Sequence, residues 1–522
     1  MRSRLSSAHN SQLIPRSDPP PAPPAISQVG AENFCLVHVS LVPVLGSVGE
    51  QKTKPTQHTV KELRSVGLNP DIILCRSAAP LSASTREKLA LFCQVPSEAV
   101  LTVHDVPNIY HVPLLLESQG VVRIIARKLR LNLFQEPQID AWRALADIVD
   151  SATEEVRIAL VGKYTGLQDS YLSVIKALQH AAIAVGRRLL VDWVDATALE
   201  AAAEKTDAET YRHSWETVRT ADGILVPGGF GDRGVEGKIA AIRHARESKQ
   251  PFLGICLGMQ CAVIEHARTV LGWTGANSAE FDPTSAHPVI VFMPEINPSQ
   301  MGGTMRLGTR RTLLRGKGER PTIARDIYGK DIKYVWERHR HRYEVNPDAV
   351  PALTSAGLVF SGTDDRAQRM EIIELGRAVH PFFFGCQYHP EFQSHPHKPS
   401  PPFHGFVLAA CGHLDKIPLL GEARDRDRGR AELASPSRRP ENATSTAAAP
   451  LDDSHAGPRQ SLNTSTTSVS TSPLRPVRAT TDSSLSATGT AIPDIAPDGA
   501  ARTLTRPAAL EGRQRGSSRE ER

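Results

Sequence analysis

Cys256 has the surroundings expected of a covalent nucleophile. It lies in a G-x-C-x-G pattern, between Gly254 and Gly258, where the apolar run 252–255 leads into the helical pattern 262–270. Glycines two residues on either side remove the Cβ atoms that would clash in a tight strand-to-helix turn, and the positive end of the following helix favours a thiolate. A lone cysteine is more often a buried structural residue, but this turn favours the nucleophile.

A proton shuttle and an orienting carboxylate follow a second apolar run. His389 and Glu391 come after the strand-like segment 382–386 and flank Pro390. Because the residue before a proline favours an extended backbone, both side chains are expected to project to the same side of the chain. A thiolate nucleophile needs such a base and carboxylate. Of the 19 histidines, only His389 combines the end of a strand with a carboxylate two residues further on.

A glycine-rich loop follows a third apolar segment. Pro227, Gly228, Gly229 and Gly231 come directly after the strand-like residues 222–226. Bare backbone N–H groups in such a loop can approach a substrate oxygen, as in an oxyanion hole. Taken alone this signal is weak, because most glycine loops are only turns.

These segments belong to alternating β and α patterns in two regions of the chain. In the first region, the apolar runs 34–44 and 71–75 flank the amphipathic segment 56–66, which predicts a β-α-β unit and a parallel sheet. In the second region, strands are expected at 156–161, 189–194, 223–226 and 252–255. One helical face there is formed by Leu172, Ile175, Leu178, Ala182 and Val185. The second region is therefore predicted to be a doubly wound α/β domain.

The composition changes at both ends of the chain. Residues 1–30 are Pro-rich without a periodic apolar pattern, and residues 422–522 contain no Phe, Tyr or Trp. Neither segment can bury enough apolar surface to offset its ordering entropy, so both are predicted to be disordered. Arg2, Arg4 and Arg16 among serines are also compatible with a mitochondrial transit peptide, although an irregular leader is favoured. The predicted division of the chain is 1–30, 31–150, 151–421 and 422–522.

The overall composition excludes several classes of protein. The 61 basic and 56 acidic residues give a net charge of +5, too balanced for a protein that relies on neutralising nucleic-acid phosphates. No run approaches the ~20 apolar residues that span a bilayer. The seven cysteines form no CxxC pair and no His pair has zinc-finger partners, so no structural metal is expected; Cys261, inside a helical pattern, is taken as a packing residue. These features predict a soluble, cytoplasmic protein without a nucleic-acid or membrane partner.

The three chemical motifs, in this order and spacing, resemble those of class I (triad) glutamine amidotransferases. Flanking sequences narrow the resemblance to CTP synthases, over about residues 31–412. The segments that carry it are 50–57, 229–237, 302–308, 337–344 and 388–392. The resemblance implies an α/β fold in which a partial, P-loop-like amidoligase region precedes a doubly wound class I glutamine amidotransferase domain. It also implies ATP-dependent amination of UTP to CTP, with ammonia from glutamine hydrolysis.

The resemblance assigns roles to the residues around the cysteine. It implies Cys256 as the nucleophile, His389 as the base and Glu391 as its orienting partner. The residues implied to hold glutamine are Gly229, Leu257, Gln260, Glu280 and Arg342. This set suits an amino acid, because a carboxylate can pair with its ammonium group and an arginine with its carboxylate.

Nucleotide sites are implied in both regions. The residues implied to hold UTP or CTP are Lys52, Thr53, Lys54, Pro55, Thr56, Gln57 and Lys88. Lysines near a β-α loop suit a triphosphate. The region implied to bind the activator GTP contains Asp232, Arg233, Glu236 and Arg306. The segment 46–53 nearly spells a phosphate-binding loop, but Gln51 stands in place of its second glycine, so that interpretation is rejected.

The nucleotide half departs from the family pattern. CTP synthases begin with a Gly-rich ATP-binding loop followed by magnesium-binding acidic residues, and nothing before Glu32 resembles them. ATP and magnesium are thus implied as cofactors without identified binding residues, and the nucleotide half is expected to be incomplete. The resemblance further implies glutamine, UTP and CTP as ligands and a homo-tetramer or filament as the assembly.

Three hypotheses follow for the function. The leading one is a CTP synthase. A second is a stand-alone amidase of the same fold, such as a γ-glutamyl hydrolase, against which the 52–57 segment and Arg306 argue. The third is a glutaminase-only or non-catalytic regulatory or assembly subunit that binds CTP, which the missing ATP loop favours.

Overall fold

The structure is a computed structural model that describes residues 30–46, 49–132, 137–166, 168–293, 305–315 and 321–434. These residues belong to one compact unit, which spans Met1–Arg438. Four parts of predicted features lie outside the described residues: the leader before residue 30, residues 47–48 of the segment 46–53, residues 302–304 of a family-like segment, and the tail from residue 435 onwards.

The first region is a parallel sheet with helices in its connections. Its strands are β1 (Val37–Leu41), β4 (Ile72–Ser77) and β5 (Val100–His104), in the order β1-β4-β5. Both pairings are parallel, and α2 (Lys54–Ser65) lies between β1 and β4 along the chain, which confirms the predicted β-α-β unit. The other elements here are β2 (Val44–Leu45), β3 (Glu50–Gln51), α3 (Ala83–Cys93), α4 (His111–Ser118) and α5 (Val121–Lys128).

The second region is built on a nine-stranded sheet, in the order β13-β12-β15-β16-β17-β9-β8-β6-β7. The strands are β6 (Glu155–Gly162), β7 (Arg188–Asp195), β8 (Gly223–Val226), β9 (Phe252–Ile255), β12 (Arg306–Leu314), β13 (Tyr334–His341), β15 (Leu358–Thr363), β16 (Met370–Leu375) and β17 (Phe383–Cys386). The half from β7 to β17 is parallel, and the half from β17 to β13 is antiparallel. β8 and β9 have the predicted bounds, because both are continuous apolar runs that are buried throughout.

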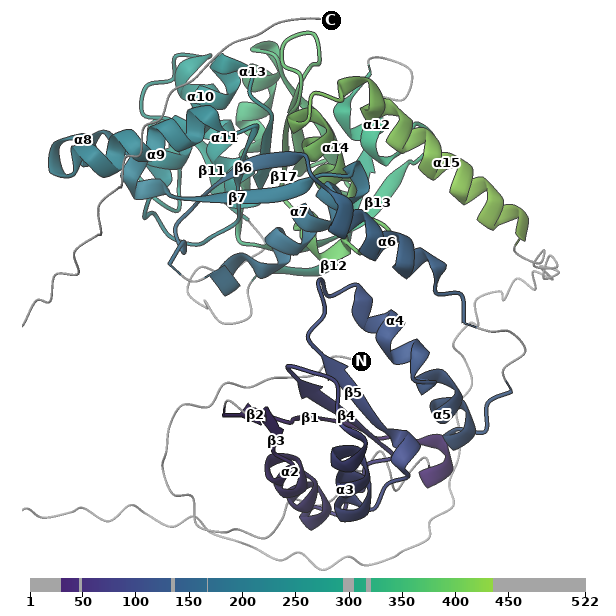
Figure 1. Ribbon diagram of the computed structural model, residues 1–522. Helices are drawn as coiled ribbons and strands as arrows, with labels where there is room; N and C mark the ends of the chain where they lie inside the picture. The colour runs from purple at the N-terminus through teal and green to yellow at the C-terminus, as the bar shows by residue number, and fades with distance from the viewer. Residues whose placement is uncertain are drawn as a thin grey trace, which may run out of the picture. The chain divides into compact units, whose positions relative to one another are not determined.

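Helices cover both faces of this sheet, so the predicted doubly wound arrangement is confirmed (Figure 1). Successive residues of β6 alternate between two cores: Ala159 and Val161 pack in one, and Ile158 and Leu160 in the other. The first core includes residues of α9 (Ala208–Thr220), α10 (Val235–Ser248), α11 (Leu257–Thr269) and α13 (Val350–Ser355). The second includes residues of α7 (Leu172–Val185), α12 (Ile323–Tyr328), α14 (Pro401–Ala410) and α15 (Ile417–Ala434). Two further helices are α6 (Asp140–Ser151) and α8 (Ala201–Thr206).

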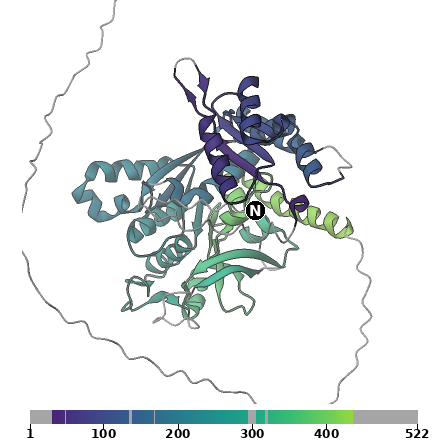
Figure 2. The same cartoon turned by 90° about the horizontal axis from the view of Figure 1, so that it is seen from below.

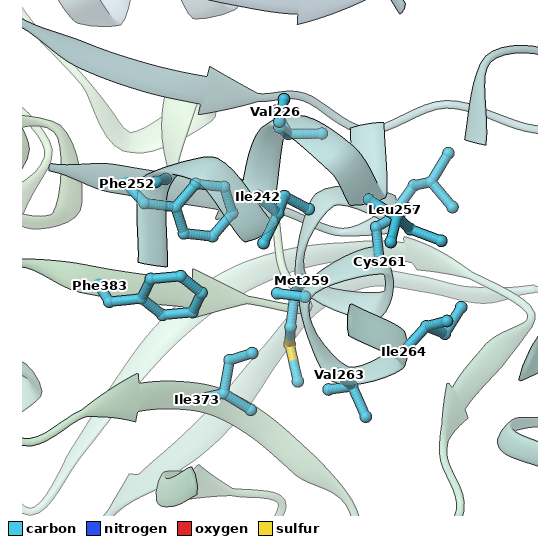
Figure 3. Close-up of a cluster of buried hydrophobic side chains, with 14 of the residues drawn as sticks. Val226, Ile242, Phe252, Leu257, Met259, Cys261, Val263, Ile264, Ile373 and Phe383 are labelled. Atoms are coloured by element: carbon cyan, nitrogen blue, oxygen red, sulfur yellow. The ribbon is translucent and has the colours of Figure 1, made fainter. Parts of the chain in front are cut away.

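Aromatic packing fixes the start of α11 against the centre of the sheet. The rings of Phe252 and Phe383, on the neighbouring strands β9 and β17, have centroids 4.5 Å apart. Ile242 of α10 and Met259 of α11 belong to the same cluster, as Figure 3 shows. Because protein cores are close-packed, this cluster leaves the first turn of α11 little freedom to shift relative to β9.

A small third sheet lies beside α11. It consists of β10 (Asn277–Ser278), β11 (Pro288–Phe292) and β14 (Tyr343–Val345), in the order β10-β11-β14. β14 follows β13 in the chain with only Arg342 between them, and the Arg342 carbonyl accepts a hydrogen bond from the Met293 amide at 3.1 Å. This sheet therefore positions the residues that follow β10 and precede β14.

Helix α15 corrects the predicted start of the tail. The prediction of a disordered segment from residue 422 is wrong for residues 422–434, which continue α15 (Figure 1 and Figure 2). Ile417 is fully buried at the start of the helix, and the Asp425 carboxylate accepts a hydrogen bond from the Lys330 amide at 3.0 Å. The segment is polar enough to resemble a tail, but these contacts with the end of α12 hold it as a helix.

Candidate active site

Cys256 occupies a strained turn between β9 and α11. Its φ of 52° and ψ of −102° are rare for a residue with a side chain, and such strain is typical of functional positions. A Cβ on Gly258 would lie only 2.1 Å from the Val226 carbonyl oxygen, so this position requires glycine. The G-x-C-x-G spacing thus has the steric cause that the sequence predicts. The helix begins at Leu257 rather than at 262, because Gly258 serves close packing and does not break the helix.

His389 and Glu391 form a hydrogen-bonded pair beside this turn. His389 Nδ1 lies 2.8 Å from Glu391 Oε1, and both side chains are largely buried. The expected extended backbone between them is wrong: Pro390–Gln393 is a 3-10 turn, in which proline fits the first position. The turn brings the Glu391 carboxylate next to the His389 ring. The backbone amide of His389 donates a hydrogen bond to the Arg338 carbonyl of β13 at 2.8 Å.

The electrostatics of His389 favour an imidazolium. Burial opposes its positive charge, but hydrogen bonds to the Cys256 thiol and to the Glu391 carboxylate outweigh burial and raise the pKa of His389 to about 10. An imidazolium between a sulfur and a carboxylate is the arrangement of an activated cysteine nucleophile.

The predicted glycine loop lies against the cysteine and the histidine. A Cβ on Gly228 would be 3.0 Å from His389 Cε1 and 3.4 Å from the Cys256 Cβ. A Cβ on Gly229 would be 3.6 Å from Leu257 Cδ2. The loop backbone is therefore close enough to present N–H groups to an oxygen that forms beside the sulfur.

A pocket opens in front of Cys256. It is lined by Gly229, Phe230, Cys256, Gln260, Glu280, His341, Arg342 and Tyr343. Four of the five residues predicted to hold glutamine line this pocket, and the fifth, Leu257, follows Cys256 as the first residue of α11. Glu280 Oε1 accepts a hydrogen bond of 3.4 Å from the Gly231 amide. Burial raises the pKa of Glu280, while this hydrogen bond and the cations Lys163 and Arg342 act in the opposite direction.

Several residues of the site escape prediction from the sequence. Phe230, His341 and Tyr343 line the pocket as neighbours of predicted residues. The buried Lys163 directs its Nζ to the Gly231 carbonyl, at 3.5 Å, from the end of β6. Gln387, two residues before His389, places Nε2 3.6 Å from the Cys256 sulfur. One signal in the sequence could have indicated Gln387: it follows an apolar strand, in the segment that leads to His389.

The residues of the predicted GTP region fall into two groups. Asp232, Arg233 and Glu236 are exposed in the loop and first turn before and within α10. Arg233 pairs with Asp195 at 3.5 Å, and Glu236 pairs with Arg268 at 2.8 Å. Arg306 instead begins β12 and forms a largely buried ion pair of 2.7 Å with Glu371.

The predicted UTP or CTP residues gather at the start of α2. Thr53 precedes the helix, Pro55 lies in its first turn, and Gln57 Nε2 donates to the Thr53 hydroxyl at 3.0 Å. Lys52 and, to a smaller extent, Lys88 lower the pKa of Glu50, so both ammonium groups lie near one carboxylate. Thr56 is buried and accepts a hydrogen bond from the Ser40 hydroxyl at 3.0 Å, which is a packing role. Lys54 is exposed and lies 6.0 Å from the centre of the Phe92 ring.

The segment that nearly spells a phosphate loop contains β3, at Glu50–Gln51, and its residues 47 and 48 lie outside the described residues. β2 and β3 pair antiparallel, with Val44 opposite Gln51 and Leu45 opposite Glu50. The extended backbone at Glu50 and Gln51 is not a cradle of the backbone amides that ATP phosphates require. Among the described residues, no group of three or more His, Cys, Asp or Glu side chains is placed to hold a metal ion.

The chain is similar to two known protein families and to several characterised relatives. The chain matches the family Glutamine amidotransferase class-I over residues 166–409 and the family CTP synthase N-terminus over residues 25–131. CTP synthase 1 of Homo sapiens is 52% identical over 414 residues, which are 78% of this chain and 69% of that protein. CTP synthase of Dictyostelium discoideum is 50% identical over 410 residues, 75% of this chain and 70% of that protein. CTP synthase of Schizosaccharomyces pombe is 51% identical over 403 residues, 76% of this chain and 66% of that protein.

The fold and the site together define a class I glutamine amidotransferase domain, preceded by an amidoligase-type region. Within that class, the identity over more than two thirds of the length of the human and Dictyostelium discoideum proteins shows that the chain belongs to the CTP synthase family, whose members are glutamine-hydrolysing carbon–nitrogen ligases. In the part of the chain that the structure describes, no helix is both long and apolar enough to cross a membrane.

Proposed function

We propose that this chain makes CTP from UTP with ammonia that it releases from glutamine at Cys256. The observation that carries the proposal is the grouping of Cys256, His389 and Glu391 around Gly228, with 2.8 Å between His389 Nδ1 and Glu391 Oε1. Family membership supports the synthase over a stand-alone amidase.

The pocket suits glutamine as the substrate. Glu280 would pair with the α-ammonium group and Arg342 with the α-carboxylate, which leaves the side-chain amide directed to the sulfur. Phe230 and Tyr343 would flank the aliphatic part of the substrate. A residue with a shorter side chain, such as asparagine, would not bring its amide carbon to the sulfur when both charged ends are held.

The chemistry would proceed through a thioester. The Cys256 sulfur attacks the amide carbon, and the charge that develops on the amide oxygen is met by backbone N–H groups of the 228–231 loop. His389 gives its proton to the leaving nitrogen, and ammonia departs. His389 then removes a proton from water, which attacks the thioester and releases glutamate. Glu391 keeps Nδ1 of the imidazole occupied, so that the other ring nitrogen handles the proton in both steps.

The first region would bind the uridine nucleotide. Lys52, Lys54 and Lys88, near the N-terminus of α2, would hold the triphosphate of UTP, or of CTP as feedback inhibitor. GTP would act through the exposed residues Asp232 and Arg233 beside the glycine loop. The family uses ATP and magnesium to activate UTP; no residues that would hold them are identified among the described residues, so no phosphoryl-transfer step is assigned to these residues. We also propose a homo-tetramer or filament, which light scattering of the purified chain would test.

Two assays on one preparation of the full 522-residue chain test the proposal. Glutamate release from glutamine reports on Cys256, and CTP formation from UTP with either glutamine or ammonium reports on the nucleotide half. The proposal predicts glutamate release, and CTP from both nitrogen sources. Glutamate release without CTP from either source would identify a glutaminase-only chain. The absence of both activities would favour a non-catalytic subunit.

A further inference from the structure

Gln387 is held rigidly beside the reacting sulfur. It follows the last residue of β17, its side chain is almost completely buried, and its backbone amide donates to the Glu371 carbonyl of β16 at 2.9 Å. Its side-chain Nε2 lies 3.6 Å from the sulfur of Cys256, within hydrogen-bond range for sulfur. The triad described above makes no use of this side chain.

The orientation of the Gln387 side-chain amide follows from the Tyr343 carbonyl oxygen, which can only accept hydrogen bonds. The Tyr343 carbonyl oxygen lies 3.0 Å from Gln260 Nε2, so this end of the Gln260 side chain must be the NH₂ group. The same Nε2 lies 3.1 Å from the other side-chain amide, and the atom that faces it must therefore be Oε1 of Gln387. Nε2 of Gln387 is then the end that faces Cys256, and it can only donate.

The Tyr343 carbonyl also accepts a hydrogen bond from His341, which in turn is hydrogen-bonded to His339. His341 Nδ1 lies 3.0 Å from the Tyr343 oxygen, and His341 Nε2 lies 3.1 Å from His339 Nδ1. Burial lowers the pKa of His341 to about 3, so the ring is neutral, donates from Nδ1 and accepts at Nε2. The neutral His339 ring then donates from Nδ1. The direction of every bond from His339 to the Cys256 sulfur is thereby determined.

We propose that Gln387 is a further catalytic residue, whose side-chain amide donates a hydrogen bond to the Cys256 sulfur and stabilises its negative charge. The inference rests on the proposed glutaminase function and deepens it. The sulfur is negative as a thiolate, neutral in the thioester and negative again when water displaces it. A fixed donor beside a largely buried sulfur favours the two charged states and so assists both formation and breakdown of the thioester.

The test is the rate at which iodoacetamide alkylates Cys256 in the full chain, measured by mass spectrometry across a range of pH. The variants are Gln387→Met, which removes the donor with little change in volume, and Gln387→Glu, which keeps the acceptor for Gln260 and replaces the donor by a carboxylate. Cleavage after Lys249 and Arg268 yields a peptide that also contains Cys261. Burial raises the pKa of Cys261 to about 12, so this thiol is an internal control within the same peptide.

The expected result is a loss of about tenfold to a hundredfold in the Cys256 alkylation rate at neutral pH in Gln387→Met, from the loss of one hydrogen bond to a charged group. The rate should recover at alkaline pH, and the loss should be larger in Gln387→Glu. The control Gln250→Met removes an amide that donates to the Val218 carbonyl and should leave the Cys256 profile unchanged. In steady-state assays kcat should fall more than KM rises.

An unchanged pH profile for Cys256 in both Gln387 variants would overturn the proposal, even if their melting temperatures fell, because a purely structural role lowers stability without moving that profile. Failure of the proposed function is a separate outcome: it would appear as glutamate release that survives the loss of Cys256. Alkylation reports on the sulfur whether or not glutamine is the substrate, so the two failures are distinguishable.

Discussion

The two main sheets of the molecule differ in how their strands are covered. Every residue of β8, β9 and β17 is buried, whereas the only buried residue of β1 is Ser40. Val39 and Leu41 of β1 are 66% and 58% exposed. The large sheet therefore fixes the loops that leave its strands, and Cys256, His389 and Glu391 lie on those loops. Beside the small sheet, two of the residues proposed to hold the nucleotide, Lys54 and Pro55, are exposed, while Thr53 and Thr56 are buried.

The largest loss of stability is expected at Gly258, where the backbone of the large sheet leaves no room for an added Cβ atom. Gly258→Ala would place a Cβ 2.1 Å from the Val226 carbonyl oxygen, a backbone atom that cannot move aside. We expect loss of more than about 4 kcal/mol of unfolding free energy, or failure to fold. Gly376→Ala is the matched control, because nothing lies within 4 Å of its added Cβ. Denaturant unfolding of both variants measures the difference; equal stabilities would contradict the close approach.

The second prediction concerns the orienting carboxylate. Glu391→Gln removes the negative charge that pairs with His389 Nδ1, so we expect glutamine hydrolysis to fall by about a hundredfold to ten-thousandfold without unfolding. Glu247→Gln, on the exposed face of α10, is the control and should retain full activity. Activity near that of the unaltered chain in Glu391→Gln would remove this residue from the triad.

A third prediction uses a buried acid of β13. Burial raises the pKa of Glu337 to about 8, and its Oε1 accepts a hydrogen bond from the Tyr328 hydroxyl at 2.9 Å. The pKa of Glu337 is higher in the folded chain than the usual value of 4.5, so the protonated carboxyl favours the folded state. This contribution to stability is fully present below about pH 4.5, and it is lost as the pH rises through about 8. Glu337→Gln, which mimics the protonated form, should therefore stabilise the chain at pH 9, on the order of 1–3 kcal/mol, and have little effect at pH 5. Urea midpoints at both pH values test this; a larger gain at pH 5 would contradict it.

The smallest change in unfolding free energy is expected for a valine-to-threonine substitution, which is compared between the two sheets. Val161→Thr buries a hydroxyl in the fully buried core of β6 and should cost about 1–3 kcal/mol. Val39→Thr, on the exposed face of β1, should change stability by less than about 0.5 kcal/mol. Chemical denaturation of the two variants gives the comparison directly. A cost for Val39→Thr equal to that for Val161→Thr would show that β1 is covered in solution.

The sequence predicts the parts of this fold that depend on local pattern. β8 is a short apolar run between Asp222 and Pro227, and β9 is one between Pro251 and the turn at Cys256, so their bounds follow from burial on both faces. Cys256, His389 and Glu391 follow from motif spacing. The extended backbone that the sequence predicts at Pro390 is a 3-10 turn instead, because proline suits both an extended chain and the first position of a helical turn, and only the tertiary contacts choose between them.

Long-range contacts determine what the sequence could not predict. Gln387 reaches Cys256 across 131 positions of the chain, and its orientation depends on Tyr343 and Gln260, which no periodicity connects. The helix at 422–434 is likewise held by a contact between Asp425 and Lys330, 95 residues apart. Such pairs are formed only when separate elements pack together.

The most direct test of the central claim compares two cysteines of one helical segment. Cys256→Ala and Cys261→Ala each remove one thiol, five positions apart, from the N-cap and the interior of α11. Glutamate release from glutamine is measured for both, together with their melting temperatures. The account predicts that Cys256→Ala folds and has no measurable glutaminase activity, while Cys261→Ala keeps the activity. Substantial glutamate release by folded Cys256→Ala would contradict the assignment of the site.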